Sequence, residues 1–513
     1  MTITLVRGRY VIERVLDRDT AVIHEDGAVA VEGDRIVAIG SHADLAARWP
    51  AAGTLGSDRH VVLPGLVNGH HHVGLTPVQL GSLDQPLELW FATRMVARDV
   101  DLHLDTLYSA FEMIGSGVTT VQHLHGRAPG PIEAVEQAAL KVIGAYRAIG
   151  MRVSYSYAFR DQNMLVYEDD AAFVARLPQD LGARLAETLA RFRITAEEYF
   201  AMTARLAEAT EADPRVAIQL APTNLHWVSD KALEGFRDVS EARGLPMHMH
   251  LNETAYQKRY ARLRGGGTAA EYLRDRGLLG PRMTLGHAVW LTEADIDLVA
   301  ESGTLICHNA SSNLRLRSGV ACLNCFAKRG IRVAMGMDEA GINDDRDMLA
   351  EMRLVLRLHR VPGMDPAEVP TAPEVLRMAS ENGGLTTPFG AAIGTLSPGS
   401  FADLSLVSWD ALSHPYLDPL IPVVDAVLLR AKAGGVETVM IGGEVVMRDR
   451  RFTRIDREAA LAELAAQLAL PLKPEEERRR VLARDILPHV RDFYAGYLDG
   501  EVREPFYAPS SRR

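Results

Sequence analysis

Eight short apolar segments alternate with amphipathic helical segments between residues 63 and 384 of this 513-residue chain. One strand–helix unit is clear in the sequence: "MTLGH" is typical of a buried strand, and "TLICH" begins the next strand. Between them, Thr292 caps the predicted helix "EADIDLVAES" and Gly303 ends it. Repeated strand–helix units indicate a parallel sheet, and eight of them favour a closed (β/α)8 barrel. The predicted strands begin near residues 63, 118, 151, 215, 245, 283, 304 and 331.

Both ends of the chain are β-rich. Residues 1–62 contain "AVAVEGDRIVAIG", in which Gly33 and Asp34 separate two alternating runs as a hairpin turn would. Residues 385–455 contain "FADLSLVSWD" and a second hairpin signal, "VETVMIGGEVVMRD". We expect the two ends to form one composite β-sandwich, so the predicted class is α/β: a TIM-like barrel over 63–384, this sandwich, and a helical tail over 456–513. The tail segment "PEEERRR" is expected to be a solvated face.

Charge and hydropathy exclude several classes of function. The 56 basic and 67 acidic residues give a net charge of −11 without long blocks of one sign, which argues against a nucleic-acid groove. The N-terminus lacks the pattern of a signal peptide, and no uncharged run approaches the roughly 20 residues of a membrane span. We therefore expect a cytoplasmic protein that acts on a small molecule, has no membrane or nucleic-acid partner, and forms a homo-oligomer.

The chain has three cysteines: Cys307, Cys322 and Cys325. Three are too few for a disulfide framework, and this number is typical of a reducing compartment. The C-x-x-C pair lacks the second pair that a structural zinc site usually needs. Because the two thiols fall on the apolar side of a predicted short helix, we expect them to serve packing alone.

Histidines and an aspartate stand where several predicted strands end, which is the catalytic face of such a barrel. In "LPGLVNGHHH", strand alternation puts His70 and His72 on one face and turns His71 away. The fifth strand ends with His250 in "MHMHLNE", and the eighth ends with Asp338 in "AMGMD". Three imidazoles and one carboxylate suit a divalent transition metal with an open position for water. We assign these four residues as ligands, for Zn²⁺ first and for Fe²⁺, Mn²⁺ or Co²⁺ as alternatives.

Five motifs in this order and spacing resemble the amidohydrolase superfamily, in particular its aminohydrolase and s-triazine hydrolase branch: "PGLVNGHHH", "HMHLNET", "LGHAVW", "HNASSNLRLRSG" and "MGMDEAG". The resemblance covers roughly residues 1–450. It implies a distorted (β/α)8 barrel with a composite β-sandwich. It also implies a single metal ion, because two-metal members bridge their ions with a carboxylated lysine on strand four, and "RVAIQLAPTNLHW" contains no lysine.

The resemblance also implies catalytic roles. Glu253 matches the glutamate that shuttles protons, and His287 matches the histidine that polarises the scissile group or steadies the oxygen of the intermediate. Asp338 would take the proton of the water that the metal activates. The alternative for Glu253 is an ordinary carboxylate that pairs with a nearby cation such as Lys258 or Arg259.

Departures from the family mark candidate substrate contacts. The second strand ends in "QHLHG", which makes His125 a candidate for the pocket. The segment "TNLHW" after strand four offers Asn224, His226 and Trp227, and "PLELW" offers Trp90, for which plain burial on a helix is the alternative.

Hydrolytic deamination of a nitrogen-rich ring is the commonest reaction of this branch, and it is our first expectation. Cleavage of an amide, urea or carbamate bond, or dehalogenation of a triazine-like ring, uses the same groups and is the alternative. A non-catalytic barrel scaffold is the remaining hypothesis. It is disfavoured because such relatives usually lose metal ligands, and here all four are present.

Overall fold

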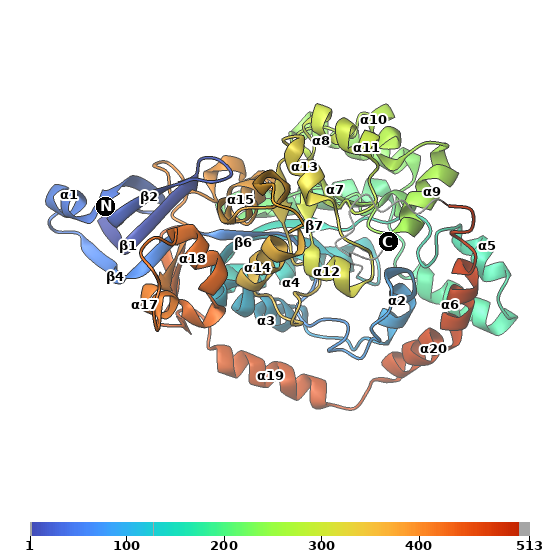
Figure 1. Cartoon of the computed structure of the whole chain (residues 1–513). Helices are drawn as coiled ribbons and strands as arrows, with labels where there is room; N and C mark the ends of the chain where they lie inside the picture. The colour runs from blue at the N-terminus through green and yellow to red at the C-terminus, as the bar shows by residue number, and fades with distance from the viewer. Residues whose placement is uncertain (1–2, 127, 502–513) are drawn as a thin grey trace.

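The computed structural model describes residues 3–126 and 128–501, and its centre is a barrel of eight parallel strands (Figure 1). All eight strands lie where the sequence predicts them. They are β5 (Leu66–His71), β6 (Val118–His125), β7 (Arg152–Tyr157), β8 (Val216–Ile218), β9 (Met247–Leu251), β10 (Met283–His287), β11 (Leu305–His308) and β12 (Val333–Met335).

The barrel consists of two four-stranded parallel sheets, β5-β6-β7-β8 and β9-β10-β11-β12. Isolated bridges join them on both sides: Leu220 pairs with Met247 beside β8 and β9, and His71 pairs with Asp338 beside β5 and β12. Strands β5, β6, β7, β9, β10, β11 and β12 are buried throughout, as expected for a parallel sheet that is covered on both faces. The predicted (β/α)8 architecture is therefore confirmed.

The two chain ends share one eight-stranded sheet in the order β16-β15-β14-β13-β4-β1-β2-β3, which confirms the composite β-domain. The predicted turns lie at Gly33–Asp34, between β2 and β3, and at Gly442–Gly443, between β14 and β15. The exact domain boundaries stay predictions. The strands are β1 (Ile3–Val15), β2 (Ala21–Glu32), β3 (Arg35–Ser41), β4 (Gly53–Pro64), β13 (Leu404–Ser408), β14 (Val436–Ile441), β15 (Glu444–Arg448) and β16 (Arg451–Phe452).

Most helices pack around the barrel, and several of them begin at capping residues visible in the sequence. Thr292 and Asp295 form the capping box of α11, and Gly303 ends that helix with a positive φ of 71°. The helices are α1 (His42–Arg48), α2 (Leu87–Thr93), α3 (Leu102–Gly115), α4 (Ile132–Ile149), α5 (Asp170–Ala175), α6 (Gln179–Ala190), α7 (Ala196–Thr210), α8 (Asp230–Arg243), α9 (Ala255–Gly265), α10 (Ala269–Asp275), α11 (Glu293–Ser302), α12 (Ala310–Arg315), α13 (Leu323–Lys328), α14 (Met348–Leu358), α15 (Ala372–Met378), α16 (Glu381–Leu385), α17 (Trp409–Ser413), α18 (Val423–Arg430), α19 (Arg457–Ala469) and α20 (Pro474–Tyr494).

The predicted helical tail is present as α19 and α20, which run along the barrel to the neighbourhood of α2 and α6 (Figure 1). The expectation that "PEEERRR" is a solvated face is wrong for part of the segment. Glu476 is 2% exposed and accepts the backbone N–H of Asp99, because the first turn of α20 packs against the barrel. Residues 502–513 of the predicted tail lie outside the described residues.

No helix within residues 3–126 and 128–501 is long and apolar enough to cross a membrane.

A buried ion pair connects the barrel to the β-domain. Arg152 at the start of β7 donates from Nε to Oδ2 of Asp403 at 2.7 Å and from Nη2 to Oδ1 at 3.0 Å. The two side chains are 0% and 1% exposed, and the guanidinium also lies 3.9 Å from the ring centre of Phe401. Both charges are desolvated, so each depends on the other.

Replacement of one partner should therefore destabilise the whole chain. We expect Arg152→Met to lower the free energy of unfolding by about 3–5 kcal/mol, because the Asp403 carboxylate stays buried without its countercharge. The measurement is urea unfolding followed by circular dichroism. Arg215→Met, which removes a more exposed pair with Glu444 at the same junction, should cost under about 1 kcal/mol. Equal losses in the two variants would contradict this view of the junction.

Candidate active site

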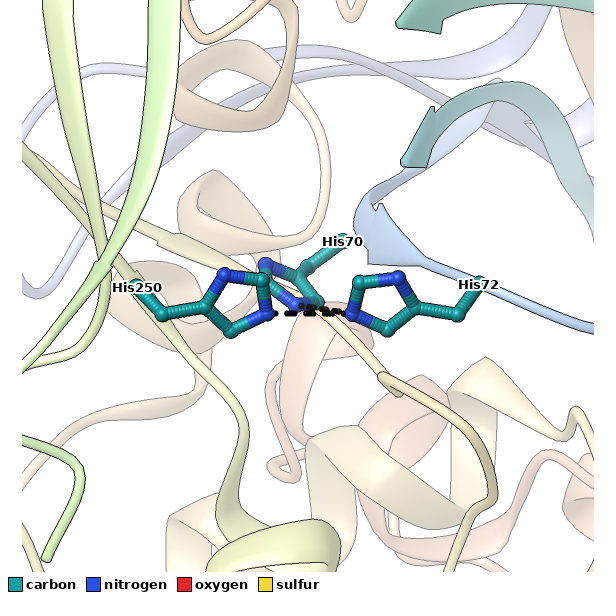
Figure 2. Close-up of side chains that lie close together, drawn as sticks. All are labelled: His70, His72 and His250. Carbon is teal, nitrogen blue, oxygen red and sulfur yellow. Dashed lines mark hydrogen bonds between the residues drawn. The ribbon is translucent and has the colours of Figure 1, made fainter. Parts of the chain in front are cut away.

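Three imidazoles converge at the carboxyl end of the barrel (Figure 2). His70 and His72 come from the end of β5, and His250 comes from β9. The Nε2 atom of His72 lies 3.0 Å from Nε2 of His70 and 3.1 Å from Nε2 of His250. His71 points the other way, as the alternation predicts, and its Nε2 lies 3.3 Å from the Ser109 hydroxyl.

Hydrogen bonds fix the tautomers of two of these rings. His72 donates from Nδ1 to the carbonyl oxygen of Leu124 at 2.7 Å, and His250 donates from Nδ1 to that of Thr223 at 2.7 Å. A carbonyl oxygen only accepts, so both Nδ1 atoms carry the hydrogen and both Nε2 atoms carry a lone pair. Burial lowers the pKa of His250 well below its ordinary value, which keeps that ring neutral. The two Nε2 atoms lie 3.1 Å apart with their lone pairs facing each other, which suits a cation bound by both. Histidines that bind metals typically donate their other ring N–H to a carbonyl or carboxylate oxygen in this way.

Asp338 completes a His₃Asp donor set. Its Oδ1 lies 3.2 Å from Nε2 of His72 and 3.6 Å from Nε2 of His70. Burial raises the pKa of this carboxyl, but the surrounding imidazoles of His72, His287 and His250 outweigh burial and hold that pKa below its ordinary value. Ser312 donates to Oδ2 at 2.5 Å, so the carboxylate is held in place. Such a set suits Zn²⁺ with an open position.

The backbone is strained where the strands end at this cluster. Asn252, His287, Ala288 and Asp338 all have positive φ angles, between 47° and 69°. Residues other than glycine adopt this region at an energetic cost, and they do so mostly where the surrounding structure requires it. These positions lie at or just after the ends of β9, β10 and β12, where the donor cluster stands.

Glu253 lies beside the cluster, 3% exposed. It does not pair with Lys258 or Arg259: its partners are Gln257, which donates at 3.5 Å, and Ser318, which donates at 3.5 Å, while Arg259 pairs with Glu501. Burial, followed by the negative charges of Asp338 and Glu88, raises the pKa of Glu253 well above its ordinary value. The raised pKa favours the protonated form of this carboxyl group.

His287 is fully buried, and its Nδ1 donates to Oδ1 of Asn313 at 2.8 Å. Its Nε2 lies 4.0 Å from Oδ2 of Asp338, so the ring stands at the cluster. Because Nδ1 carries the hydrogen, the neutral ring presents a lone pair at Nε2 and accepts a proton there. Polarisation of a carbonyl or a ring nitrogen by this residue would require its protonated form.

A cavity of about 200 Å³ opens over His72, His250, Glu253 and Asp338. Trp90 and Trp227, two of the predicted substrate contacts, line it together with Leu87, Phe91, Arg94, Gly126, Ala158, Arg160, Phe192, Leu316 and Glu339. The guanidinium of Arg160 lies 3.3 Å from the ring centre of Trp227, and that ring meets Phe91 edge to face. Part of the wall is therefore flat and aromatic, and the charged side chains of Arg94, Arg160 and Glu339 lie among these rings.

The other predicted substrate contacts lie outside this lining. His125 is 7% exposed, and its Nδ1 lies 2.6 Å from the hydroxyl of Tyr155. Asn224 forms a backbone bridge with His250 and so connects the segment after β8 to β9. His226 is fully buried, 4.1 Å from the ring centre of Tyr167. Their roles as substrate contacts stay predictions.

Sequence reasoning missed several residues of the site. Arg94 lines the cavity and pairs with Glu339 at 2.8 Å, and Arg160 stacks on an aromatic wall. Glu339 follows a predicted ligand directly, which was a usable signal. Ser312 and Asn313 lie in the motif "HNASSN" after the seventh strand, whose polar character was visible but whose targets depend on the fold.

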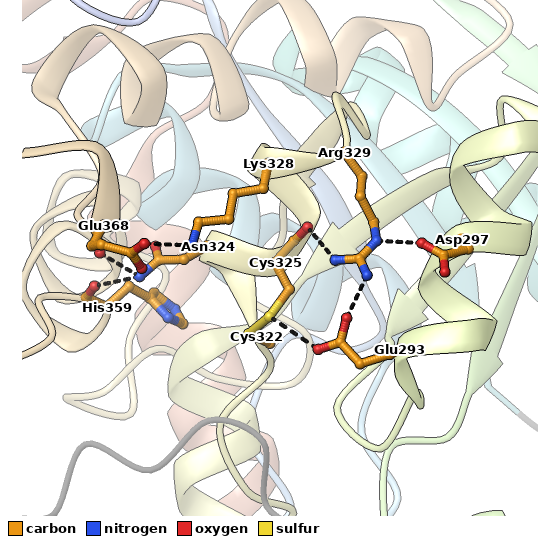
Figure 3. The surroundings of a disulfide bond; sticks show 9 residues. All are labelled: Glu293, Asp297, Cys322, Asn324, Cys325, Lys328, Arg329, His359 and Glu368. Carbon is orange, nitrogen blue, oxygen red and sulfur yellow. Dashed lines mark hydrogen bonds and ion pairs between the residues drawn. A yellow bond between two sulfur atoms is a disulfide. The ribbon is translucent and has the colours of Figure 1, made fainter.

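Cys322 and Cys325 form a disulfide at the start of α13 (Figure 3). The expectation that they serve packing alone is wrong, because the first turn of the helix brings their Cα atoms within 5.2 Å. Arg329 of the same helix contacts Asp297 and Glu293 on α11, and so ties the disulfide region to that helix.

A family model described as the amidohydrolase family matches residues 61–446, and a bacterial imidazolonepropionase-like composite domain matches residues 27–52. The chain belongs to the amidohydrolase family. The family resemblance is therefore confirmed, and with it a hydrolase that acts on carbon–nitrogen bonds.

Relatives and solved structures agree with this membership. A 5-methylthioadenosine/S-adenosylhomocysteine deaminase of Syntrophobacter fumaroxidans is 30% identical, over 88% of this amidohydrolase and 94% of the relative. An adenosine deaminase of Xanthomonas campestris, solved with bound zinc, superposes with a TM-score of 0.75 at 25% identity, over 93% and 98% of the two chains. An atrazine chlorohydrolase of Arthrobacter aurescens shares the fold, with a TM-score of 0.74 at 21% identity, over 90% and 99%.

The inward lone pairs generate a prediction about metal content. His72→Ala and His250→Ala should each lose most of the bound metal, because each removes a donor whose tautomer is fixed toward the centre. His71→Asn is the matched control and should keep close to one ion per chain, since His71 points away. Elemental analysis of the purified variants checks this, and full occupancy in both alanine variants would refute the ligand assignment.

The raised pKa of Glu253 predicts how stability depends on pH in the metal-free protein. Above the ordinary value of 4.5 the unfolded chain ionises this group while the folded chain keeps its proton, so wild-type stability falls as pH rises toward the folded pKa. Glu253→Gln does not titrate, so its stability relative to wild type should increase with pH. Denaturation of the chelated proteins between pH 4 and pH 9 tests this. A difference independent of pH would show that the carboxyl is ionised in the fold.

Proposed function

We propose that this amidohydrolase is a zinc-dependent deaminase that hydrolyses an amino-substituted, nitrogen-containing heterocycle. The proposal rests on one observation above all: His72 and His250 direct their Nε2 atoms at one point, 3.1 Å apart, beside the buried carboxyl of Glu253, whose pKa is raised. Lone pairs so close favour a cation, and a protonated carboxyl next to it can supply a proton to a leaving group. The deaminase relatives and the neighbour solved with zinc support this choice.

His70, His72, His250 and Asp338 would hold the ion. A zinc ion in such a site lowers the pKa of bound water to about 7 and so supplies a nucleophile at neutral pH. The lowered pKa of Asp338 keeps this group ionised at neutral pH, so its carboxylate would be free to take the proton of the attacking water. Ser312 and the neighbouring imidazoles hold it in position for that transfer.

Glu253 would act as the acid. Its carboxyl lines the cavity, and its raised pKa favours the protonated form, from which a proton can pass to a ring nitrogen or to the departing amine. The like charges of Asp338 and Glu88 make ionised Glu253 unfavourable, so the proton that Asp338 takes from the water can return to Glu253 after each turnover. Positioned acid–base catalysis of this kind contributes about 10²–10⁴ to the rate.

The cavity suits a small flat ring. At about 200 Å³ it lies below the roughly 300–1,000 Å³ typical of sites for drug-sized ligands. Trp90 and Trp227 offer aromatic faces to a heterocycle, and aromatic pairs gain about 0.5–1.5 kcal/mol beyond area burial. A cytoplasmic location and a homo-oligomeric assembly accompany this proposal as expectations.

The test is release of ammonia by the zinc-loaded enzyme from adenosine, 5-methylthioadenosine, S-adenosylhomocysteine, guanine, aminopyrimidines, pterins and aminotriazines. We expect turnover of at least one class, and Glu253→Gln should lower kcat by about 10²–10⁴ with full metal content, because glutamine has no proton to transfer.

Glu208 is an exposed carboxylate on α7 that does not line the cavity. Glu208→Gln is therefore the control and should keep wild-type turnover. Near-normal kcat in fully loaded Glu253→Gln would exclude the acid role. Release of chloride from a chlorotriazine, or cleavage of an amide, urea or carbamate without any deamination, would assign the enzyme to the alternative reactions.

A further inference from the structure

One side of the catalytic cavity is a short segment, residues 87–99, that we call the wall segment. It consists of α2, the 3₁₀ turn η1 (Arg94–Val96) and the three residues that follow. Its inner face supplies four residues of the cavity lining: Leu87, Trp90, Phe91 and Arg94. The position of this segment therefore sets the width of the cavity.

Polar contacts of Arg94 and Glu88 attach the inner face to the barrel. Arg94 pairs with Glu339 at 2.8 Å. Glu88, which is 3% exposed, accepts from Thr254 at 2.5 Å and from Tyr167 at 3.1 Å. These contacts hold α2, whereas the residues after η1 reach outward.

The C-terminal tail holds the outer face of the wall segment. The backbone N–H of Asp99 donates to Oε1 of Glu476 at 2.9 Å, and Nη2 of Arg479 donates to the Asp99 carboxylate at 2.7 Å. Arg479 also donates to the carbonyl oxygen of Ala97, and Nε of Arg480 donates to that of Val96, each at 3.1 Å. Three residues in the first two turns of α20, Glu476, Arg479 and Arg480, thus bind the backbone or side chains of residues 96–99.

The tail is itself fixed to the barrel. Leu482, Ile486, Val490 and Tyr494 recur every four residues along α20 and are all buried, so the helix presents one apolar stripe to the protein. Asp485 pairs with Arg184 on α6 at 3.3 Å. Glu501, just after the helix, pairs with Arg259 and Arg262 on α9, the helix that follows Glu253 and Thr254. The tail therefore spans the rim of the cavity.

The tail also lines a cavity that adjoins the catalytic cavity. Arg94 and Phe192 line both the catalytic cavity and an adjoining outer cavity of about 730 Å³, whose other walls include Arg479 and Leu482 of α20. The family model ends at residue 446, so this part of the site lies outside the matched region. Most of the arginines that line the outer cavity form ion pairs with carboxylates, for example Arg191 with Glu475 and Arg479 with Asp99. This pairing indicates a structural role for these charges.

We propose that the C-terminal tail is a substrate-positioning element of this enzyme, and that Arg479 and Arg480 are positioning residues that fix the wall segment. The proposal rests on the proposed function, because it places the substrate ring against Trp90 and Phe91. Without these two arginines the wall segment becomes more mobile. The substrate ring then loses its fixed contacts with Trp90 and Phe91, and the substrate binds more weakly. The proposed metal ligands lie at the ends of β5, β9 and β12, away from the wall segment. The variant enzyme therefore keeps its metal ion, and the rate of the chemical step stays unchanged.

The test compares three double variants of the full-length, zinc-loaded enzyme. Arg479→Ala/Arg480→Ala removes the anchors, and Arg479→Lys/Arg480→Lys keeps donors of the same charge. Arg478→Ala/Arg484→Ala is the matched control, since it removes the same charge from the same helix and neither side chain hydrogen-bonds to the wall segment in the described part of the chain. Each is measured for KM and kcat on the substrate that the ammonia screen identifies, for metal content, and for amide hydrogen exchange.

We expect the alanine pair to raise KM by about tenfold, the order expected for loss of hydrogen bonds from charged donors, with kcat within about twofold of the control and one ion per chain. Amides of residues 87–99 should exchange faster in this variant and nowhere else, and the lysine pair should restore much of the wild-type KM. The exchange experiment needs no substrate. A negative ammonia screen would therefore overturn the proposed function and leave exchange to decide whether the tail fixes the wall.

Unchanged KM and unchanged exchange at 87–99 in the alanine pair would overturn the proposal. So would a general rise in exchange with parallel losses of kcat, metal and melting temperature, since that result describes a merely structural contact. If the alanine pair does not fold, Arg480→Ala alone, which removes a single backbone contact, is held to the same outcomes.

Discussion

The site depends on the fixed tautomers of His72 and His250. Each ring donates its only N–H to a backbone carbonyl oxygen, one from the end of β6 and one from the segment after β8, so each must turn a lone pair to the centre of the barrel. Two such lone pairs at 3.1 Å are unfavourable alone and favourable around a cation. The same backbone that builds the barrel therefore determines the protonation of its ligands, and the proposed metal chemistry follows from main-chain geometry.

Strain and burial are concentrated at this point. Asp338 and His287 adopt positive φ angles at the ends of β12 and β10, and Glu253 is buried beside another carboxylate. These features lower stability on their own, and the remainder of the molecule compensates for them. The barrel strands are almost continuously buried, and the Arg152–Asp403 pair joins the barrel to the sheet made by both chain ends. Such an arrangement is common where a rigid scaffold holds an active site.

Contacts outside the barrel also hold part of the cavity wall in place. An apolar stripe on α20 docks the helix, and the arginines on its neighbouring positions reach the carbonyl oxygens of residues 96 and 97. A segment outside the matched family region thereby becomes part of the environment of the cavity. The proposal for the tail implies that residues which never touch the substrate contribute to substrate binding in this enzyme.

Local patterns in the sequence were enough to predict the eight barrel strands, the two glycine hairpins and the convergence of His70, His72, His250 and Asp338, because strand alternation and the common edge of parallel strands are short-range rules. Long-range contacts were beyond such rules. The lining by Arg94 and Arg160, the Cys322–Cys325 bond, the carboxylate environment of Glu253 and the docking of "PEEERRR" each depend on segments that are distant in sequence or on exact backbone turns. The sequence by itself determined which chemical groups stand at the strand ends. Only the tertiary structure decided which of them face a cavity, which carry protons and what holds them there, since burial and hydrogen-bond partners are set by packing.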